Sequence, residues 1–485
     1  MTKKAELVFI PSPGMGHLVS TVQLAKLLLH LHSNLSISVL IMKPSFDSKI
    51  TSYIDSLTSD TTSTTTGRLK FINLPQSFPG DIIKFMSTLV ETQGPHVKEA
   101  VTNIVELSNS VPDSPRLAGF VLDMFVTPFV DVANEFGVPS YVFYTSGAAF
   151  LGFKFYIQVL HDEQNVEFHE LKDSETEFTI PTYANPVPTK SFPPIMFRPD
   201  SEAVNFVINI AKGLREMKGI MVNTFLELES YAVDSFSNDK LQIPPIYPVG
   251  PILDLAGSSG SHPNYDTIMR WLDEQPRLSV VFLCFGSMGS FSVEQVTEIA
   301  NALEKSGHRF LWALRRPGEQ VEGVRGNPTD YENVAEVLPE GFLDRTAEIG
   351  KVIGWAPQVD ILSHPATGGF VSHCGWNSTL ESIWFGVPMA AWPLYADQHM
   401  NALLLVKDLG LAVDLKMDYK NYADEVEIVK AEHIEKGIKC LMEQDSEVRK
   451  RMKEMSDESR KALVDGGSSH SSLRHFIDEV TKNLS

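Results

Sequence analysis

The residues best suited to chemistry lie in one stretch, from Trp355 to Gln398, which gathers aromatic, acidic, amide and histidine side chains. Near its centre an apolar run ends at Val371, a short polar turn follows, and helix-forming residues begin at Trp376. This pattern predicts a strand, a tight turn and the start of a helix. The first N–H groups of a helix have no partner within it and carry the positive end of the helix dipole. The turn is therefore a candidate site for a phosphate group.

Glu381 is the next candidate in this stretch. It follows Asn377 by one helical turn, so the two side chains are expected on the same face of the helix. A carboxylate placed there can accept two hydrogen bonds from a ribose diol, as the acidic residue of dinucleotide-binding folds does. The stretch thus predicts a nucleotide site.

Two further candidates come from the N-terminal part of the chain. His17 stands where the first predicted strand gives way to the first helix, and Asp123 ends the apolar run GFVLD. Ligands of open α/β sheets bind at the carboxyl ends of the strands, so both residues are placed to face a substrate. Each also has an ordinary alternative: the histidine can cap or pack at a helix start, and the aspartate can form a cap or a turn.

If these two side chains met, the carboxylate would fix the tautomer of the imidazole and stabilise the imidazolium form. That arrangement takes a proton from a hydroxyl group. The pair therefore predicts general-base chemistry.

Parallel strands must position these groups, and the N-terminal part has the pattern for them. A short apolar run, Glu6–Pro11, precedes residues Leu18, Val22, Ala25 and Leu29 at helical spacing. Similar strand-like runs follow, separated by helical or loop segments: Ser36–Met42, Leu69–Leu74, Leu117–Leu122, Ser140–Tyr144 and Gly219–Val222. Such alternation predicts a parallel sheet covered by helices. Thr179–Pro199, which is rich in proline, is expected to be a surface loop.

The segment Ile243–Pro263 is rich in proline and glycine and is the best candidate for an interdomain linker. Beyond it the pattern restarts, with strands expected at Val280–Phe285, Phe310–Leu314 and Lys351–Gly354 and helices at Val293–Lys305, Asn401–Leu409 and Ala431–Met442. Arg316–Pro339 is polar and is expected to be a loop. The fold class predicted is α/β, with two Rossmann-like βαβ domains facing each other across a cleft.

The stretch from Trp355 to Gln398 resembles, from first residue to last, the signature box of the plant family 1 glycosyltransferases, which use UDP-sugars. Ser372 replaces the more usual threonine, and Asp397 occupies a position where the family uses aspartate or glutamate. The resemblance covers essentially the whole chain. It implies the GT-B architecture, with residues 1–245 binding the acceptor, 246–465 binding the UDP-sugar, and the helix in 466–485 returning to the N-terminal domain.

The resemblance also implies roles for individual residues. His17 would be the catalytic base and Asp123 its partner. Trp355 would stack on uracil, where stacking is worth about 1–3 kcal/mol per base. The remaining implied donor contacts are Ala356 and Gln358 near base and ribose, Glu381 on the ribose, Ser287, His373, Asn377, Ser378 and Tyr395 around the diphosphate, and Trp376, Asp397, Gln398 and Thr145 on the sugar.

The reaction expected from the resemblance is inverting transfer of glucose from UDP-glucose to a hydroxyl of a small lipophilic acceptor, which yields a β-glucoside. A flavonoid or other phenolic is the first candidate and a terpenoid the second, because a phenol gives up its proton more easily than an aliphatic alcohol does. Four apolar residues near the site motifs are candidates for the acceptor pocket: Met15, Phe125, Phe150 and Met288. The alternatives are another UDP-sugar on the same fold and a non-catalytic UDP-sugar binding protein.

Composition sets limits on the remaining function classes. The formal net charge of -20 argues against binding nucleic acid or an anionic membrane, both of which need an extended basic surface. Three widely spaced cysteines argue against a disulfide framework, and no apolar run reaches the ~18 residues of a membrane span. The N-terminal apolar run is too short for a signal peptide, so a cytoplasmic protein, expected to be a monomer, is predicted.

Competing motifs are incomplete. Ser287 is not in a hydrolase elbow, because Phe285 stands where G-x-S-x-G needs its first glycine. The spacing of His364 and His373 does not match a metal site, so no metal and no permanently bound cofactor are expected. Gly14-Met15-Gly16 is only a fragment of a dinucleotide fingerprint, which disfavours an NAD-dependent oxidoreductase.

Overall fold

Two units make up the chain, each assembled from segments that are separated in the sequence. Unit 1 consists of Met1–Val166, Asp200–Asp254 and Lys461–Ser485, and unit 2 of Glu167–Pro199 and Leu255–Arg460. The computed structural model describes residues 4–42, 53–55, 57, 67–75, 82–198, 201–237, 243–255, 264–318, 320–321, 324–419 and 427–482. Only the backbone is described for 82–87, 201, 320–321 and 324–325. Part of the expected linker, 256–263, lies outside the described residues.

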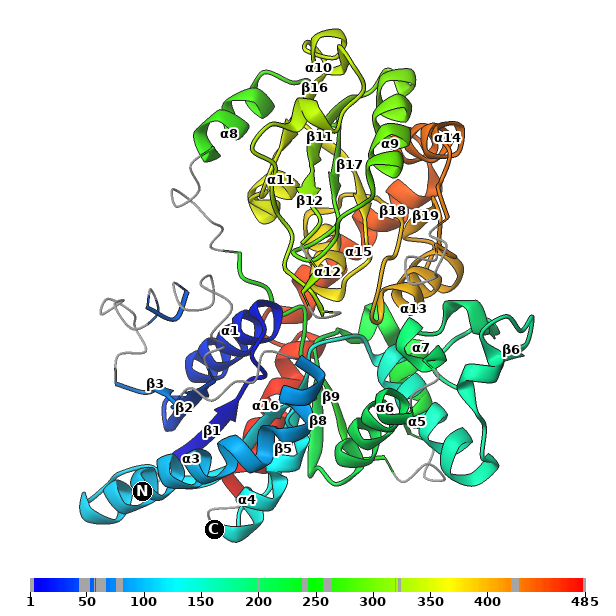
Figure 1. Ribbon diagram of the computed structural model, residues 1–485. Coiled ribbons are helices and arrows are strands. Elements are labelled where there is room, and N and C mark those ends of the chain that lie inside the picture. The colour runs from blue at the N-terminus through cyan, green and yellow to red at the C-terminus, as the bar shows by residue number, and fades with distance from the viewer. Residues whose placement is uncertain are drawn as a thin grey trace. The chain divides into compact units, whose positions relative to one another are not determined.

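Unit 1 is built on a parallel sheet of seven strands in the order β3-β2-β1-β4-β5-β8-β9 (Figure 1). The strands are β1 (Ala5–Ile10), β2 (Leu35–Ile41), β3 (Leu69–Asn73), β4 (Arg116–Asp123), β5 (Ser140–Tyr144), β8 (Gly219–Val222) and β9 (Ile246–Pro248). The main helices are α1 (Met15–Leu31), α3 (Ile82–Ser110), α4 (Val130–Glu135), α5 (Ala148–Gln164), α6 (Ser201–Arg215), α7 (Leu226–Ser235) and α16 (Ser468–Lys482).

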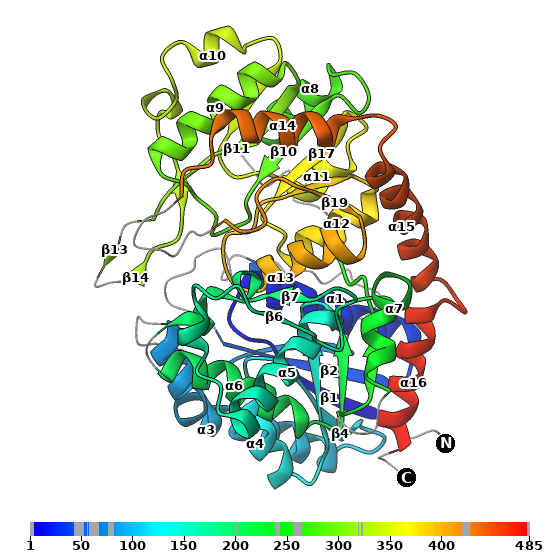
Figure 2. The same cartoon turned by 90° about the vertical axis from the view of Figure 1, so that its right-hand side faces the viewer.

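Strands β1, β2, β5 and β8 are buried along their whole length, because helices cover both faces of the sheet. Helix α16 lies on the face opposite α3 and α4 (Figure 2). It is the last helix of the described chain, yet its apolar side chains belong to the same core cluster as those of β1 and α1. Phe476 of α16 meets Tyr141 of β5 edge to face, with ring centroids 5.0 Å apart.

Unit 2 has a second parallel sheet, of six strands in the order β16-β11-β10-β17-β18-β19. The strands are β10 (Val280–Cys284), β11 (Arg309–Ala313), β16 (Gly350–Ile353), β17 (Thr367–Ser372), β18 (Met389–Ala391) and β19 (Ala412–Asp414). The helices are α8 (Tyr265–Asp273), α9 (Val293–Ser306), α10 (Phe342–Arg345), α11 (Gln358–Ser363), α12 (Trp376–Phe385), α13 (Gln398–Leu403), α14 (Ala431–Met442) and α15 (Glu447–Leu463).

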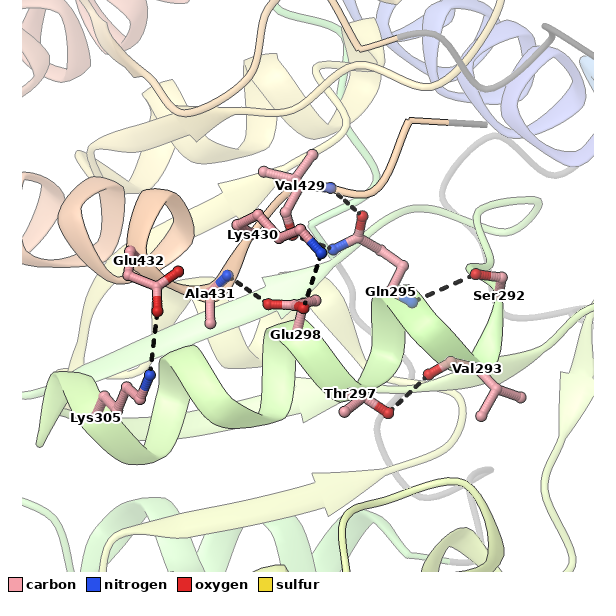
Figure 3. A network of polar contacts seen from close by, with 10 residues as sticks. All are labelled: Ser292, Val293, Gln295, Thr297, Glu298, Lys305, Val429, Lys430, Ala431 and Glu432. Carbon is pink, nitrogen blue, oxygen red and sulfur yellow. Dashed lines mark hydrogen bonds and ion pairs between the residues drawn. The ribbon is translucent and has the colours of Figure 1, made fainter. Parts of the chain in front are cut away.

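Helices α9 and α14 lie side by side over this sheet (Figure 2), and side chains of α9 hold the start of α14. The buried Gln295 exchanges two hydrogen bonds with the backbone of Val429, at 3.0 and 2.8 Å. Glu298 accepts from the N–H of Ala431 at 2.7 Å, so its carboxylate satisfies the first turn of α14 (Figure 3). Ser292 in turn caps α9 through the N–H of Gln295.

Three expectations from the sequence need correction. Arg316–Pro339 is not simply a loop, because β12 (Arg315–Arg316) pairs with β15 (Thr329–Asp330) and β13 (Gln320–Val321) with β14 (Val324–Arg325). Thr179–Pro199 is not merely a surface loop, since Phe192, Met196 and Phe197 in it are buried. The helix expected at 401–409 starts at Gln398 and continues as a π-helical turn, Leu404–Asp408.

Candidate active site

The topology of unit 1 brings the first two candidates together. The strand order reverses between β1 and β4. These two strands are neighbours in the sheet, although β2 and β3 lie between them in the sequence. Loops at the carboxyl ends of two such strands diverge to opposite faces, and this is where open α/β sheets bind ligands. His17 lies in the first turn of α1, directly after β1, and Asp123 is the last residue of β4.

The two side chains are in direct contact. Nδ1 of His17 lies 2.7 Å from Oδ2 of Asp123, whose side chain is fully buried, while the histidine side chain keeps a quarter of its surface exposed. The other carboxylate oxygen, Oδ1, accepts a hydrogen bond from the N–H of Phe125 at 3.0 Å. A carboxylate at Nδ1 favours the tautomer that carries its proton there, which leaves Nε2 as the proton acceptor. The pair therefore has the geometry of a general base and its partner.

Thr145 approaches the same imidazole nitrogen. Its hydroxyl oxygen lies 3.0 Å from Nδ1 of His17, and the residue is buried. The resemblance implied that Thr145 contacts the sugar, which stays a prediction; in the structure its hydroxyl contacts His17. The ring of Phe125 lies 5.2 Å from that of His17, centroid to centroid, and adds an apolar wall beside the exposed edge of the imidazole.

Glu229 supports this corner of unit 1 and was not predicted from the sequence. It is buried at the start of α7, in a non-helical conformation, and its two carboxylate oxygens accept hydrogen bonds from the N–H groups of Ala148 and Ala149, each at 2.8 Å. Burial raises the pKa of this carboxyl group, against the lowering effect of these hydrogen bonds. Glu229 thereby caps α5 immediately after the segment that carries Thr145.

Unit 2 repeats the same arrangement. Its strand order reverses between β10 and β17, and Ser287 and His373 follow the carboxyl ends of these two strands. His373 is buried, and burial lowers its pKa to about 4, so its imidazole is neutral near pH 7. A Cβ at Gly286 or Gly375 would lie 2.5 or 2.6 Å from its Nε2, so only glycine leaves room for this ring.

The turn between β17 and α12 is formed as the sequence predicts. Cys374 has a φ of 60°, a left-handed conformation that is uncommon for any residue but glycine, and α12 begins at Trp376. The N-cap residue is Gly375, which has no side chain to cover the first N–H groups of the helix. A phosphate oxygen can therefore approach them closely.

Gln358 and Glu381, which are expected near the ribose, form one hydrogen-bonded cluster with Ser378, which is expected at the diphosphate. Gln358, the first residue of α11, donates from Nε2 to Oγ of Ser378 at 2.8 Å and to Oε2 of Glu381 at 2.7 Å. Asn377 and Ala356 lie beside members of this cluster in the chain and are half-buried. The structure thus brings Gln358, Ser378 and Glu381 together from two helices.

Trp355 has a partner that the sequence did not reveal. The guanidinium of Arg315 lies over its indole ring, 5.2 Å from the centroid. Arg315 is buried and is held by the carbonyl oxygens of Pro328 and Thr329 and by Asp330 at 3.0 Å. The indole is therefore held against a fixed cation.

The last group lies at the start of α13 and in the loop before it. Gln398 is buried, and its Oε1 accepts hydrogen bonds from the N–H groups of Leu394 and Tyr395, at 2.9 and 3.0 Å. Burial raises the pKa of Tyr395 to about 12. Oδ2 of Asp397 accepts a hydrogen bond from Asn401 at 3.0 Å. Gln398 thus braces the loop that carries two other candidates.

The four candidates for an acceptor pocket have different surroundings. Met15 is half-buried against the core of unit 1, and Phe125 lies beside His17. Phe150 is buried in α5 and stacks on Phe153, so it is a core residue with little exposed surface. Met288, in unit 2, is largely exposed.

Two searches of the described residues bear on other functions. Within the ranges given above, no group of three or more histidine, cysteine, aspartate and glutamate side chains is placed to hold a metal ion. The prediction that the site works without a metal remains a prediction. In the same part of the chain, no helix combines the length and the apolar character needed to cross a membrane.

Comparison with known proteins identifies similar chains and folds. Residues 258–438 match the family model described as UDP-glucoronosyl and UDP-glucosyl transferase. The chain is 54% identical to UDP-glucose flavonoid 3-O-glucosyltransferase 6 of Fragaria ananassa, over 99% of each chain. It is also similar to a solved transferase from Siraitia grosvenorii in complex with UDP, at 49% identity and a TM-score of 0.88, covering 98% of this chain and 100% of that one. A Medicago truncatula protein, UGT71G1 complexed with UDP-glucose, gives 40% identity and a TM-score of 0.84 over 99% of both chains.

Proposed function

The chain belongs to the UDP-glucoronosyl and UDP-glucosyl transferase family, and we propose that it transfers glucose from UDP-glucose to a hydroxyl of a small lipophilic acceptor. A flavonoid or another phenolic is the first candidate for this acceptor. The observation that carries this proposal is the 2.7 Å contact between His17 and Asp123 at the carboxyl ends of two adjacent strands. A protein that only binds a UDP-sugar has no need for this pair. Terpenoid alcohols are the second acceptor class.

In this mechanism Nε2 of His17 removes the acceptor proton as the oxygen attacks the sugar carbon. Asp123 stabilises the imidazolium that results. One displacement suffices, so the configuration at the sugar carbon inverts and a β-glucoside forms. Thr145 helps to hold the imidazole in place through its contact with Nδ1.

The leaving group is UDP, and the residues of unit 2 supply its binding. Uracil stacks on Trp355, beside Ala356, and Glu381 with Gln358 takes the ribose hydroxyls. The start of α12 takes the diphosphate, with Ser287, His373, Asn377, Ser378 and Tyr395 around it. Trp376, Asp397 and Gln398 hold the sugar.

The acceptor side is proposed more generally. Phe125 and Met15 lie next to His17 in space or in sequence and offer apolar surface to an aromatic acceptor. The relative from Fragaria ananassa is named for transfer to the 3-hydroxyl of flavonoids, which supports a phenolic acceptor for this chain. Phe150 and Met288 remain proposals for the same pocket.

The proposal also assigns a function to each domain of the chain. We assign acceptor binding to residues 1–245, UDP-sugar binding to 246–465 and a supporting helix to 466–485. The proposal includes a monomer and a cytoplasmic location, and the free state of the three cysteines is compatible with a reducing compartment.

The direct test measures release of UDP from UDP-glucose in the presence of a panel of flavonoids, simple phenols, terpenoid alcohols and aliphatic alcohols. We expect acceptor-dependent release, with a β-glucoside as product and phenolics fastest. Binding of UDP-glucose without release for any acceptor would favour a non-catalytic binding protein. Release from another UDP-sugar alone would favour the same fold with a different donor.

Donor choice gives a prediction at Gln398. Glucose and galactose differ in the direction of one hydroxyl, and a buried amide that donates and accepts can discriminate between them. We expect UDP-glucose to be used faster than UDP-galactose, UDP-xylose or UDP-glucuronate at equal concentration. Gln398→Ala should lower glucose transfer by about one to two orders of magnitude and UDP affinity by less. Initial rates and calorimetric binding of UDP measure the two effects.

A second substitution separates sugar recognition from bracing of the loop. Gln398→Glu keeps an oxygen that can accept from the N–H groups of Leu394 and Tyr395, but it loses the amide donor. Glucose transfer should therefore fall in this variant as well. A variant with the wild-type rate would show that Gln398 only braces the loop, and a faster rate with any of the other three donors would overturn the donor assignment.

Metal dependence is the next prediction. The proposal places the charge of the diphosphate on the N–H groups at the start of α12 and on the side chains of His373, Asn377 and Ser378. Activity should therefore survive exhaustive chelation at the wild-type rate. Loss of UDP release in the presence of a chelator, restored by a divalent cation, would contradict this assignment.

A further inference from the structure

A buried amide outside the signature stretch joins two parts of the proposed donor site. Nδ2 of Asn401, in α13, lies 3.0 Å from the carbonyl oxygen of Cys374 and 3.0 Å from Oδ2 of Asp397. An amide nitrogen has two hydrogens, so Asn401 can donate to both acceptors at once. The residue is 1% exposed, so water does not substitute for either bond.

The two acceptors belong to segments with different proposed tasks. Cys374 is the left-handed residue of the turn that precedes α12, and its peptide group orients the start of that helix, where the diphosphate is assigned. Asp397 is the N-cap residue of α13 and is assigned to the sugar. A strained turn and a half-buried carboxylate both need a fixed partner to keep one orientation.

We propose that Asn401 is a positioning residue that holds the diphosphate turn at Cys374 and the sugar-binding carboxylate of Asp397 in one fixed arrangement. This inference rests on the proposed function and deepens it, because Asn401 itself touches neither the diphosphate nor the sugar. Its effect on the reaction passes through its two hydrogen-bonded partners.

Aspartate is the most informative replacement at this position. It has nearly the same shape as asparagine but no hydrogen to donate when ionised, and its charge would face both the Cys374 carbonyl and the Asp397 carboxylate. Two carboxylates at this separation share a proton, so the higher of their two apparent pKa values rises. When that proton is present it restores one of the two hydrogen bonds.

The neighbouring titratable groups do not produce the pH dependence that is expected for Asn401→Asp. The titratable side chains around the two acceptors in the described chain include the thiols of Cys284 and Cys374, the phenol of Tyr395 and the imidazoles of His373 and His399. Burial raises the pKa of the two thiols to about 11 and about 12 and that of the phenol to about 12, and it lowers the pKa of His373 to about 4. Burial also lowers the pKa of His399, and because this imidazole is present in both proteins its titration cancels from the ratio of variant to wild type.

The test compares kcat/KM for UDP-glucose in wild type and Asn401→Asp between pH 6 and 8. Loss of the donors to the buried Cys374 carbonyl and the half-buried Asp397 carboxylate should lower kcat/KM at pH 8 by about one to two orders of magnitude. The ratio of variant to wild type should then rise severalfold as the pH falls and the carboxylate pair gains its proton. A ratio near one at pH 8, or a deficit that is the same at every pH, would overturn the inference.

Two further variants complete the experiment. Asn333→Asp makes the same exchange at an exposed N-cap residue of unit 2, where aspartate caps equally well, and it should leave the pH profile unchanged. If Asn401→Asp yields no folded protein, Asn401→Ala serves as the test instead. This variant should lower kcat/KM without a new pH dependence. An unchanged kcat/KM would overturn the inference. Absence of UDP release from the wild-type protein would instead remove the proposed function, and this inference with it.

Discussion

Replacing His17 by alanine is expected to lower the rate of glucosyl transfer to an alcohol or a weak phenol by about 10²–10⁴-fold, the usual contribution of a positioned general base. The affinity for UDP should stay nearly unchanged, because this imidazole contacts Asp123, Thr145 and Phe125 in unit 1, whereas UDP binding is assigned to residues of unit 2. Single-turnover rates with such acceptors, together with calorimetric binding of UDP, measure the two effects.

The loss should depend on the acceptor. A phenol acidic enough to be partly ionised at the assay pH needs less help from a base, so His17→Ala should slow its transfer least. His30→Ala provides the control, because His30 is an exposed residue in the last turn of the same helix. Activity at the wild-type level toward weak phenols and alcohols would remove His17 as the base.

Asp123→Asn should lower kcat by a similar factor, on the order of 10²–10⁴-fold. The reason lies in the hydrogen bonds of Asp123. Oδ1 of Asp123 already accepts from the N–H of Phe125, and an asparagine oxygen would keep that bond. The amide NH₂ would then face Nδ1 of His17 and donate to it. The imidazole would carry its proton on Nε2 instead, so the acceptor hydroxyl would meet a donor in place of a base.

Double substitution makes this assignment testable. If His17 and Asp123 act as one unit, Asp123→Asn should cost little in a protein that already carries His17→Ala, and the two effects should be far from additive. Asp131→Asn, at an exposed position on α4, is the matched control and should have no effect. Additive losses, or unaffected turnover in the single variant, would show that the pair does not work as proposed.

Most of the central strands were predictable because they are buried on two faces and so form short continuous apolar runs, whereas the three-residue strands β9, β18 and β19 were not predicted. The predicted run Ser140–Tyr144 coincides with β5, and Lys351–Gly354 differs from β16 by one residue at each end. The pattern failed where strands were too short to show any periodicity, as in β12 and β15. Buried loop residues such as Phe192 were missed because composition alone marked their segment as exposed.

For the site, the sequence indicated residues next to the ends of predicted strands, since the topology of a parallel sheet gathers those ends. His17, Asp123 and His373 all lie in such places. Glu229 and Arg315 could not be found this way, because their roles depend on tertiary contacts. The N–H of Ala148 that Glu229 accepts from is 81 residues away in the sequence, and no motif relates the two.

Helix α16 has a consequence for the biosynthesis of the protein. Leu473, Phe476, Ile477 and Val480 fill part of the same core as β1 and α1, yet they are translated only after the whole of residues 255–460. On the ribosome, β1 and the helix that carries His17 are therefore synthesised before unit 2. Part of their apolar surface stays uncovered until unit 2 and then α16 have been synthesised. The half of the protein that carries the proposed base is thus begun first and completed last.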